Sequence, residues 1–249
     1  MRQGRRDAEE GNHAPFPFDP NSLNAVVISH AHLDHSGLLP RLAAAGYRGP
    51  IFATVATCEL LELMLLDSAH IQEHDAEWEN KWRLRQGKPA IAPICTTAET
   101  EQALKLRRAL DYGVQQEVAP GVRLTYHDAG HILGAAIVEL EVDDHHLTRR
   151  LVFSGDLGNG CSPLMHSPSI LDSADAVMLE STYGDRDHRC SEDTLDELAD
   201  ILQQAHLDGG NVLIPAFAVG RTQDLIFHLG RFYQQGRLPQ QAVFLDSPM

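Results

Sequence analysis

The sequence predicts an α/β fold in which a mixed sheet covered by helices is followed by a β-α-β-α-β run of the Rossmann-like kind. Short apolar runs of strand length alternate along the chain with segments whose apolar residues recur at helical spacing. The chain has 249 residues, of which 43% are hydrophobic and 22% charged, and this suffices for a sizeable buried core. It contains no G-x-G-x-x-G motif, so a bound dinucleotide is not indicated.

The first part of the chain predicts the helix-covered mixed sheet. Gly46 can end the first expected helix, and the long apolar helix leads into a polar stretch that contains Trp78 and Trp82. A polar turn at residues 143–146 joins the last two strands of this part. The expected strands are residues 24–29, 50–54, 122–126, 136–142 and 150–154, and the expected helices are residues 37–45, 56–67 and 97–110.

The last third of the chain predicts the parallel unit. Ser191 can cap a helix with Leu195, Leu198 and Leu202 on one face, and Gly209 can end it. Strands joined by helices in this way favour parallel pairing. The expected order is a strand at 176–180, a helix from Ser191, a strand at 211–215, a helix at 222–233 and a strand at 242–246.

The charge balance and the cysteines exclude several classes of protein. Twenty Lys and Arg against 35 Asp and Glu give a net charge of −15, which argues against non-specific coating of nucleic acid. No apolar stretch approaches the ~18–20 residues of a membrane span, and the N-terminal residues lack the apolar core of a secretory signal. The four cysteines form no C-x-x-C pair, as expected of reduced thiols. We therefore expect a soluble, cytoplasmic protein without a membrane partner.

Three histidines and an aspartate fall within six residues directly after the first expected strand, in the segment SHAHLDH of residues 29–35. Because side chains alternate along an extended strand end, we expect His30 and His32 to point the same way. Asp34 and His35 then face a neighbouring position. Two adjacent sets of nitrogen and oxygen ligands are what a two-zinc site needs. The alternative is a solvated, histidine-rich turn, which four ligand-type residues at this spacing disfavour.

Two later segments carry residues of the same kind. DAGHILG (residues 128–134) places His131 between glycines at a strand end, and SGDLG (residues 154–158) places Asp156 at the tip of another apolar strand. Each segment alone is typical of a turn, but the series indicates one site. His70 and His74 are four residues apart on an expected helix, and we expect them on a solvated polar face because no third ligand accompanies them.

HAHLDH, GHILG and SGDLG, in this order, resemble the motifs of the metallo-β-lactamase superfamily. LESTYGDR (residues 179–186), IPAFAVGRTQ (residues 214–223) and LDSPM (residues 245–249) are similar to its β-CASP branch, which processes nucleic acids. The resemblance runs from about Phe16 to Met249 and is strongest to bacterial and archaeal RNA-processing members. It implies a metallo-β-lactamase αββα sandwich over residues 1–188, incomplete at its N-terminus, followed by the beginning of a β-CASP domain over residues 189–249.

The resemblance also implies roles for individual residues. Asp34 would orient the attacking water in addition to binding metal, and Glu180 matches the acidic motif that works with a leaving-group histidine. Arg221 would contact a substrate phosphate, with an ordinary surface arginine as the alternative. The implied ligands are His30, His32 and His131 for one zinc ion, Asp34 and His35 for a second, and Asp156 as the bridge between them.

The function that the resemblance implies is zinc-dependent hydrolysis of RNA phosphodiester bonds, with RNA as the substrate and a homodimer left open as the assembly. Two zinc ions ~3.5–4 Å apart acidify a shared water, so that a nucleophile exists at neutral pH. One alternative is a small-molecule metallohydrolase of the same superfamily. Another is a non-catalytic, metal-binding fragment.

Two parts of the family pattern have no counterpart in this chain. The expected N-terminal strands are absent, and so are two C-terminal histidine motifs, one of which completes the second zinc site while the other supplies the acid. The expectation is a fragment or a truncated gene product that binds one metal tightly and a second weakly, with impaired catalysis.

Overall fold

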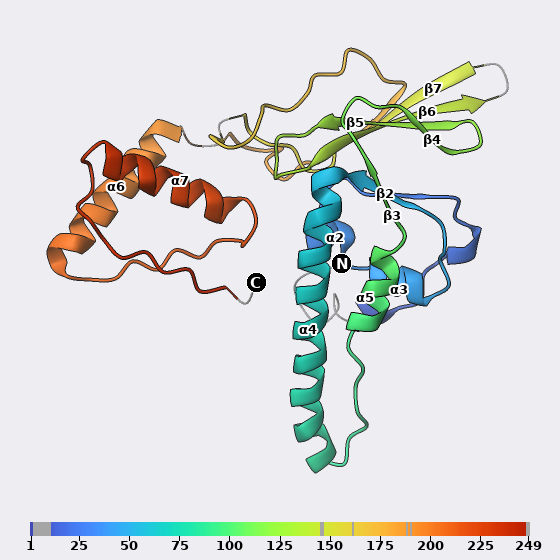
Figure 1. Cartoon of the computed structure of the whole chain (residues 1–249), viewed down its shortest axis with the longest axis horizontal. Coiled ribbons are helices and arrows are strands. Elements are labelled where there is room, and N and C mark those ends of the chain that lie inside the picture. The colour runs from blue at the N-terminus through green and yellow to red at the C-terminus, as the bar shows by residue number, and fades with distance from the viewer. Residues whose placement is uncertain (2–10, 145–146, 161, 188, 190, 248–249) are drawn as a thin grey trace.

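Two β-sheets face each other in the computed structural model, and helices flank the first of them (Figure 1). The structure describes residues 1, 11–144, 147–160, 162–187, 189 and 191–247. The predicted α/β fold is confirmed, because two sheets are combined with helices in the described chain. No helix in the described part of the chain has the length and apolar character needed to cross a lipid bilayer.

The first sheet is parallel and has the order β1-β2-β3. Val26 pairs with Ile51, and Ile51 pairs with Arg107. The helices pack on one side of this sheet around a core that includes Leu42, Leu61 and Ala103. The elements of this part are η1 (Pro20–Ser22), β1 (Val26–Val27), α2 (Leu33–Ser36), α3 (Leu39–Ala44), β2 (Ile51–Thr54), α4 (Val55–Arg85), α5 (Thr97–Leu104) and β3 (Arg107–Leu110).

The second sheet has the order β4-β5-β6-β7-β8 and is antiparallel except for the pairing of β7 with β8. A second apolar core fills the space between the two sheets, where Leu110 and Phe52 of the first sheet meet Leu124 and Tyr126 of the second. The Tyr126 hydroxyl donates a hydrogen bond of 2.8 Å to the Phe52 carbonyl. The strands are β4 (Gln116–Ala119), β5 (Val122–Asp128), β6 (Ala136–Asp144), β7 (Leu147–Phe153) and β8 (Ala176–Met178).

Helix α4 begins beside the edge of the second sheet. The Thr54 side chain accepts a hydrogen bond of 3.2 Å from the Thr57 backbone N–H and so caps the helix. Both hydroxyls also donate to the Gly134 carbonyl, at 2.6 Å from Thr54 and 2.8 Å from Thr57. The start of α4 is therefore fixed to the loop between β5 and β6, and the helix runs from there away from the sheets (Figure 1).

The C-terminal helices α6 (Ser191–Asp208) and α7 (Arg221–Gln234) form as predicted and pack on each other around Ala199, Leu202 and Phe232. Both helices are amphipathic, and their apolar faces build this separate core. Val219, just before α7, packs instead against the apolar cluster that contains Ile132. The segment before α7 therefore lies against the loop that follows β5.

Several predicted elements are corrected by the structure. Helix α4 continues through the tryptophan-containing stretch to Arg85, well beyond residue 67. The helix expected at 97–110 ends at Leu104, because residues 107–110 pair with the open edge of β2 and place Leu110 between the sheets. Strand β4 was not predicted, since Gln116–Ala119 contains only two apolar residues.

The strands expected at 211–215 and 242–246 are not formed in the described residues. Their expected neighbour, β8, pairs with β7 at the end of the second sheet, and neither segment pairs with the other edge of β8 in the described residues. The side chains of Leu213 and Phe244 are accordingly 94% and 88% exposed. Cys58 and Cys95 are free thiols, whereas Cys161, Cys190 and the tip of the turn at 143–146 lie outside the described residues.

Candidate metal centre

The SHAHLDH segment leaves the carboxyl end of β1 and enters α2. Ile28 still donates to the Phe52 carbonyl of β2 at 2.9 Å, and Ser29 accepts from the Ala136 N–H of β6 at 2.8 Å. The chain therefore passes from one sheet to the edge of the other before it turns at His32, the residue that precedes α2. This passage carries His30 and His32 to the end of the sandwich where β5, β6 and β7 also end or begin.

Two glycine loops bring the remaining predicted residues to the same place. The Gly158 N–H donates to the Ala129 carbonyl at 2.8 Å, which joins the loop after β7 to the loop after β5. A Cβ at Gly158 would lie only 1.9 Å from the Gly130 carbonyl oxygen, so only glycine permits this approach. The two loops carry His131 and Asp156, which are thereby held side by side.

Four ligand atoms converge at this point. Nε2 of His30 lies 3.1 Å from Nδ1 of His32, which in turn lies 3.2 Å from Nε2 of His131. Oδ2 of Asp156 lies 3.7 Å from His30 Nε2 and 3.6 Å from His131 Nε2. Tetrahedral zinc with bonds of about 2.0–2.1 Å separates its ligand atoms by about 3.3 Å. The four atoms are therefore spaced like ligands around one ion, and all lie within 4.8 Å of one another.

The other carboxylate oxygen of Asp156 faces a second pair of predicted ligands. Oδ1 of Asp156 lies 3.2 Å from Nε2 of His35, which lies 3.6 Å from Oδ2 of Asp34. Asp156 thus divides its two oxygens between the three-histidine cluster and the Asp34–His35 pair. This arrangement is what a carboxylate that bridges two ions requires.

The protonation states suit metal binding. Burial lowers the pKa of His30 to about 3, and the nearby His35 adds to this effect. Burial also lowers the pKa of His32 and of His131. The hydrogen bond with His35 holds the pKa of Asp156 at about 2 and raises the pKa of His35. At neutral pH three neutral imidazoles therefore face one carboxylate, the states in which these groups bind metal.

The donor set fits a divalent metal of borderline softness. Three imidazole nitrogens with a carboxylate are typical zinc ligands, and His30 is fully buried at the centre of the group. Nε2 of His32 is also buried, and it has no hydrogen-bond partner within the described part of the protein. An imidazole whose Nδ1 faces two other ring nitrogens is placed for a cation rather than for a protein hydrogen bond.

Glu180 borders the metal centre, whereas Arg221 is exposed at the start of α7. One oxygen of Glu180 accepts a 2.7 Å hydrogen bond from the Leu157 N–H, next to Asp156, so this carboxylate borders the centre. Arg221 is the first residue of α7, is exposed, and makes no ion pair with any residue that the structure describes. His70 and His74 are exposed on α4, as predicted.

Three neighbours of the centre were not predicted. The Ser29 hydroxyl lies 3.2 Å from Nδ1 of His30 and 3.5 Å from Nδ1 of His35, so it can orient both rings. The ring of Phe217, from the segment before α7, lies 6.3 Å from the ring of His32. A cavity of about 540 Å³ opens beside Asp156 and His35 and is lined by Glu180 and by apolar residues of both sheets.

Two named proteins are clearly similar to this chain in sequence. Ribonuclease TTHA0252 of Thermus thermophilus is 40% identical over 250 residues, which cover 100% of this chain and 52% of that protein. Transcription termination factor FttA of Methanothermobacter thermautotrophicus is 34% identical over 233 residues, which cover 92% of this chain and 34% of that protein. The match to the Thermus ribonuclease spans the whole chain and so includes the segments that meet at the metal centre.

These similarities agree with the resemblance of the sequence motifs to the β-CASP branch of the metallo-β-lactamase superfamily.

The other comparisons add less to this assignment. No family model matches the chain. The solved structure of MEM-A1, a subclass B3 metallo-β-lactamase from a soil metagenome library, is 17% identical, covers 55% of this chain and 43% of that chain, and has a TM-score of 0.33. A similarity this weak supports no conclusion about this chain. The chain spans about half the length of the Thermus ribonuclease and about a third of the archaeal factor.

Proposed function

We propose that this chain carries the metal centre of a zinc-dependent hydrolase that cleaves RNA phosphodiester bonds. The observation that carries the proposal is the convergence of His30, His32, His131 and Asp156 on one point, in a chain that is 40% identical to a named ribonuclease. When bound, two zinc ions would acidify water towards a pKa near ~7 and offset the negative charge of a phosphate.

The protein residues have separate tasks in this proposal. The three histidines would hold the first ion and Asp34 with His35 the second, and Asp156, which faces both groups, would help to hold each. Asp34 is half exposed, so its carboxylate can also accept a proton from a water at the mouth of the site. Glu180 keeps the Asp156 loop in place through the Leu157 N–H. Arg221 would bind a substrate phosphate from the start of α7.

We further propose that residues 1–188 form the metallo-β-lactamase domain and residues 189–249 the beginning of the β-CASP domain. The separate apolar core of α6 and α7 supports this division. Val219 and Phe217 would then bring the second domain to the edge of the metal centre, where an extended polyanion can pass between the two.

The test is a chimera in which this chain replaces the matching 52% of the Thermus ribonuclease, which supplies the other half of the molecule. We expect the zinc-loaded chimera to cleave a labelled single-stranded RNA. His32→Ala in the same chimera should reduce the rate by a factor of ~10² or more, because a ligand of the first ion is lost. The proposal is wrong if a folded, metal-loaded chimera leaves RNA intact.

The same assay distinguishes a small-molecule hydrolase. A chromogenic phosphodiester, a thioester and a lactone are offered in parallel with the RNA. Faster turnover of one of these substrates than of RNA would assign the metal centre to a small molecule and overturn the proposed substrate class.

A further inference from the structure

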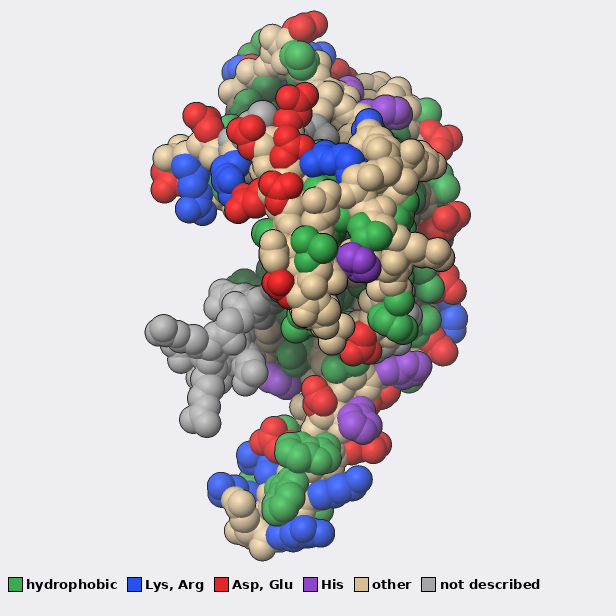
Figure 2. Space-filling model, turned by 90° about the vertical axis from the view of Figure 1, so that its left-hand side faces the viewer, with side chains coloured by type: hydrophobic (Ala, Val, Ile, Leu, Met, Phe, Trp, Pro, Cys, Tyr) green, Lys and Arg blue, Asp and Glu red, His purple; other side chains and the backbone are tan. Residues whose placement is uncertain are grey.

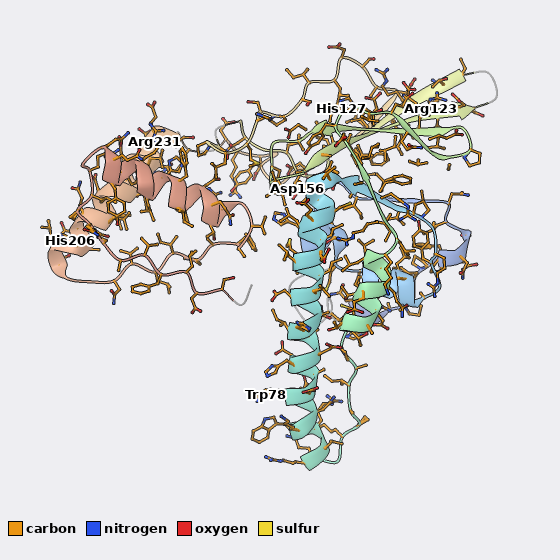
Figure 3. All side chains as sticks on the ribbon, viewed as in Figure 1. Trp78, Arg123, His127, Asp156, His206 and Arg231 are labelled. Carbon is orange, nitrogen blue, oxygen red and sulfur yellow. The ribbon has the colours of Figure 1, made fainter. Side chains whose placement is uncertain are left out.

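The far end of α4 carries an exposed patch of aromatic and basic side chains, which we call the helix tip and define as Trp78, Lys81, Trp82, Arg85 and Lys88. The helix tip is remote from the metal centre. Thr57 contacts Gly134 of the His131 loop, and Trp82 follows 25 residues later, roughly 37 Å along a helix. Figure 3 shows Trp78 near this far end, on the side of α4 that faces α6 and α7 in that view.

The two tryptophans are exposed although they are the largest apolar side chains available for a core. Trp78 is 60% exposed and Trp82 is 51% exposed. Their ring centroids lie 6.3 Å apart, and the Arg85 guanidinium carbon lies 5.3 Å from the Trp82 ring. His70 and His74 precede them at the same four-residue spacing, so ring side chains follow one row along the helix surface.

The patch is a rigid surface rather than a frayed helix end. The Asn80 side chain donates to the Ile91 carbonyl and accepts from the Ile91 N–H, each at 2.8 Å. Arg83 donates to the Pro89 carbonyl at 2.8 Å. These bonds fix the segment that returns from the helix along one side of α4. The tryptophans occupy the other side and remain open.

The helix tip region is positively charged, whereas the whole chain is negatively charged. Residues 78–91 contain four of the chain's 20 Lys and Arg but only one of its 35 Asp and Glu. The one acid, Glu79, lies 3.4 Å from Arg83. Lys81, Arg85 and Lys88 form no ion pair within the described residues. Figure 2 shows blue basic side chains around hydrophobic ones at this end of the molecule.

We propose that the helix tip binds single-stranded RNA. Flat aromatic rings stack on unpaired bases, and neighbouring cations contact the phosphates, which is how proteins bind single strands without reading their sequence. A duplex hides its bases in the stack and offers the tryptophans nothing to cover. The choice of RNA among single-stranded polyanions rests on the proposed function, but the binding itself does not require the metal centre.

The experiment uses the chain's own tryptophan fluorescence, because Trp78 and Trp82 are its only two tryptophans. The full chain in EDTA is titrated with a single-stranded 12-nucleotide oligoadenylate, with a 12-base-pair RNA duplex and with the corresponding single-stranded DNA. We expect saturable quenching by the single strands, weaker binding of the duplex, and a log–log salt slope of about −2 from three phosphate contacts. If no binding is seen in EDTA, the helix-tip proposal fails, and the proposal for the metal centre is not affected.

Variants decide whether the helix tip is responsible. Trp82→Ala should weaken binding by about tenfold, and Lys81→Gln with Arg85→Gln should flatten the salt slope towards −0.7, measured with fluorescein-labelled RNA. Lys105→Gln removes an exposed cation elsewhere and should change nothing. Unchanged fluorescence with every nucleic acid, or equal affinity in Trp82→Ala, would overturn the proposal. Quenching by anionic phospholipid vesicles without quenching by RNA would assign the patch to a membrane surface instead.

Discussion

At the residue scale, His30 is the most buried histidine of the metal centre, and its burial links stability to pH. Its pKa is about 3 in the folded chain and about 6.5 when unfolded. The unfolded chain therefore binds more protons between these pH values, and stability is lost as the pH falls through this range. We expect the metal-free chain to lose on the order of 1 kcal/mol of unfolding free energy per pH unit between pH 6 and 4.5.

Denaturant unfolding of the EDTA-treated chain at several pH values measures this slope. The raised pKa of His35 acts only above about pH 6.5, and the lowered pKa of Asp156 acts only below about pH 4, so neither disturbs the window. His30→Gln should have a shallower slope, with the remainder due to His32 and His131. Equal slopes for the two proteins would show that His30 is not buried in neutral form.

Asp156 and Asp34 should differ in how many ions they affect. Asp156 faces both ligand groups, at 3.6 Å from His131 and 3.2 Å from His35, whereas Asp34 lies 3.6 Å from His35. Asp156→Asn should therefore weaken both ions, and Asp34→Asn only the second, each by more than about 100-fold because a direct ligand is lost. Competition with a chromophoric zinc chelator measures both affinities. Loss of the first ion in Asp34→Asn would contradict the assignment.

The ligand set could be predicted because three motifs occur in the order found in a known family, although each later motif alone is typical of a turn. The structure brings His30, His32, His131 and Asp156 together. The contact of Phe217 with His32 could not be predicted, since it depends on how two segments far apart in the chain pack.

At the scale of the elements, the two glycine loops determine whether His131 and Asp156 meet. Gly158→Ala would place a Cβ 1.9 Å from the Gly130 carbonyl oxygen, and the backbones of the two loops would have to move apart. We expect a loss of about 1–3 kcal/mol of unfolding free energy together with weaker metal binding. Thermal unfolding with and without zinc provides the measurement.

Gly230 in α7 offers a matched control. A Cβ there meets no atom within 4 Å, and the residue lies in a helix. Gly230→Ala should therefore stabilise the chain by up to about 1 kcal/mol and leave metal binding unchanged. Destabilisation by both substitutions, or by neither, would contradict the role assigned to the loop packing.

Helix and strand periodicity predicted the elements well where the contacts are local. The amphipathic pattern from Ser191 gave α6, and the alternation around residues 122–142 gave β5 and β6. The pattern failed at residues 107–110, where the backbone pairs with β2, and at residues 211–215, which do not pair with β8 in the described structure. At both places the outcome depends on whether distant segments pair, which a local pattern does not specify.

At the scale of the whole molecule, charge is distributed unevenly. The net charge of −15 opposes broad contact with a polyanion, so attraction has to be local. Two zinc ions would add about four positive charges at one place, and the helix tip adds basic side chains at another. An acidic protein can in this way bind RNA at two separated places.

The metal content of the purified chain tests the central claim most directly. We expect elemental analysis to find at least one tightly held zinc ion per chain, bound by His30, His32, His131 and Asp156. His32→Ala should lose this ion, while His74→Ala, which removes an exposed histidine of α4, should retain it in full. Equal zinc in the wild-type chain and in His32→Ala would contradict the account.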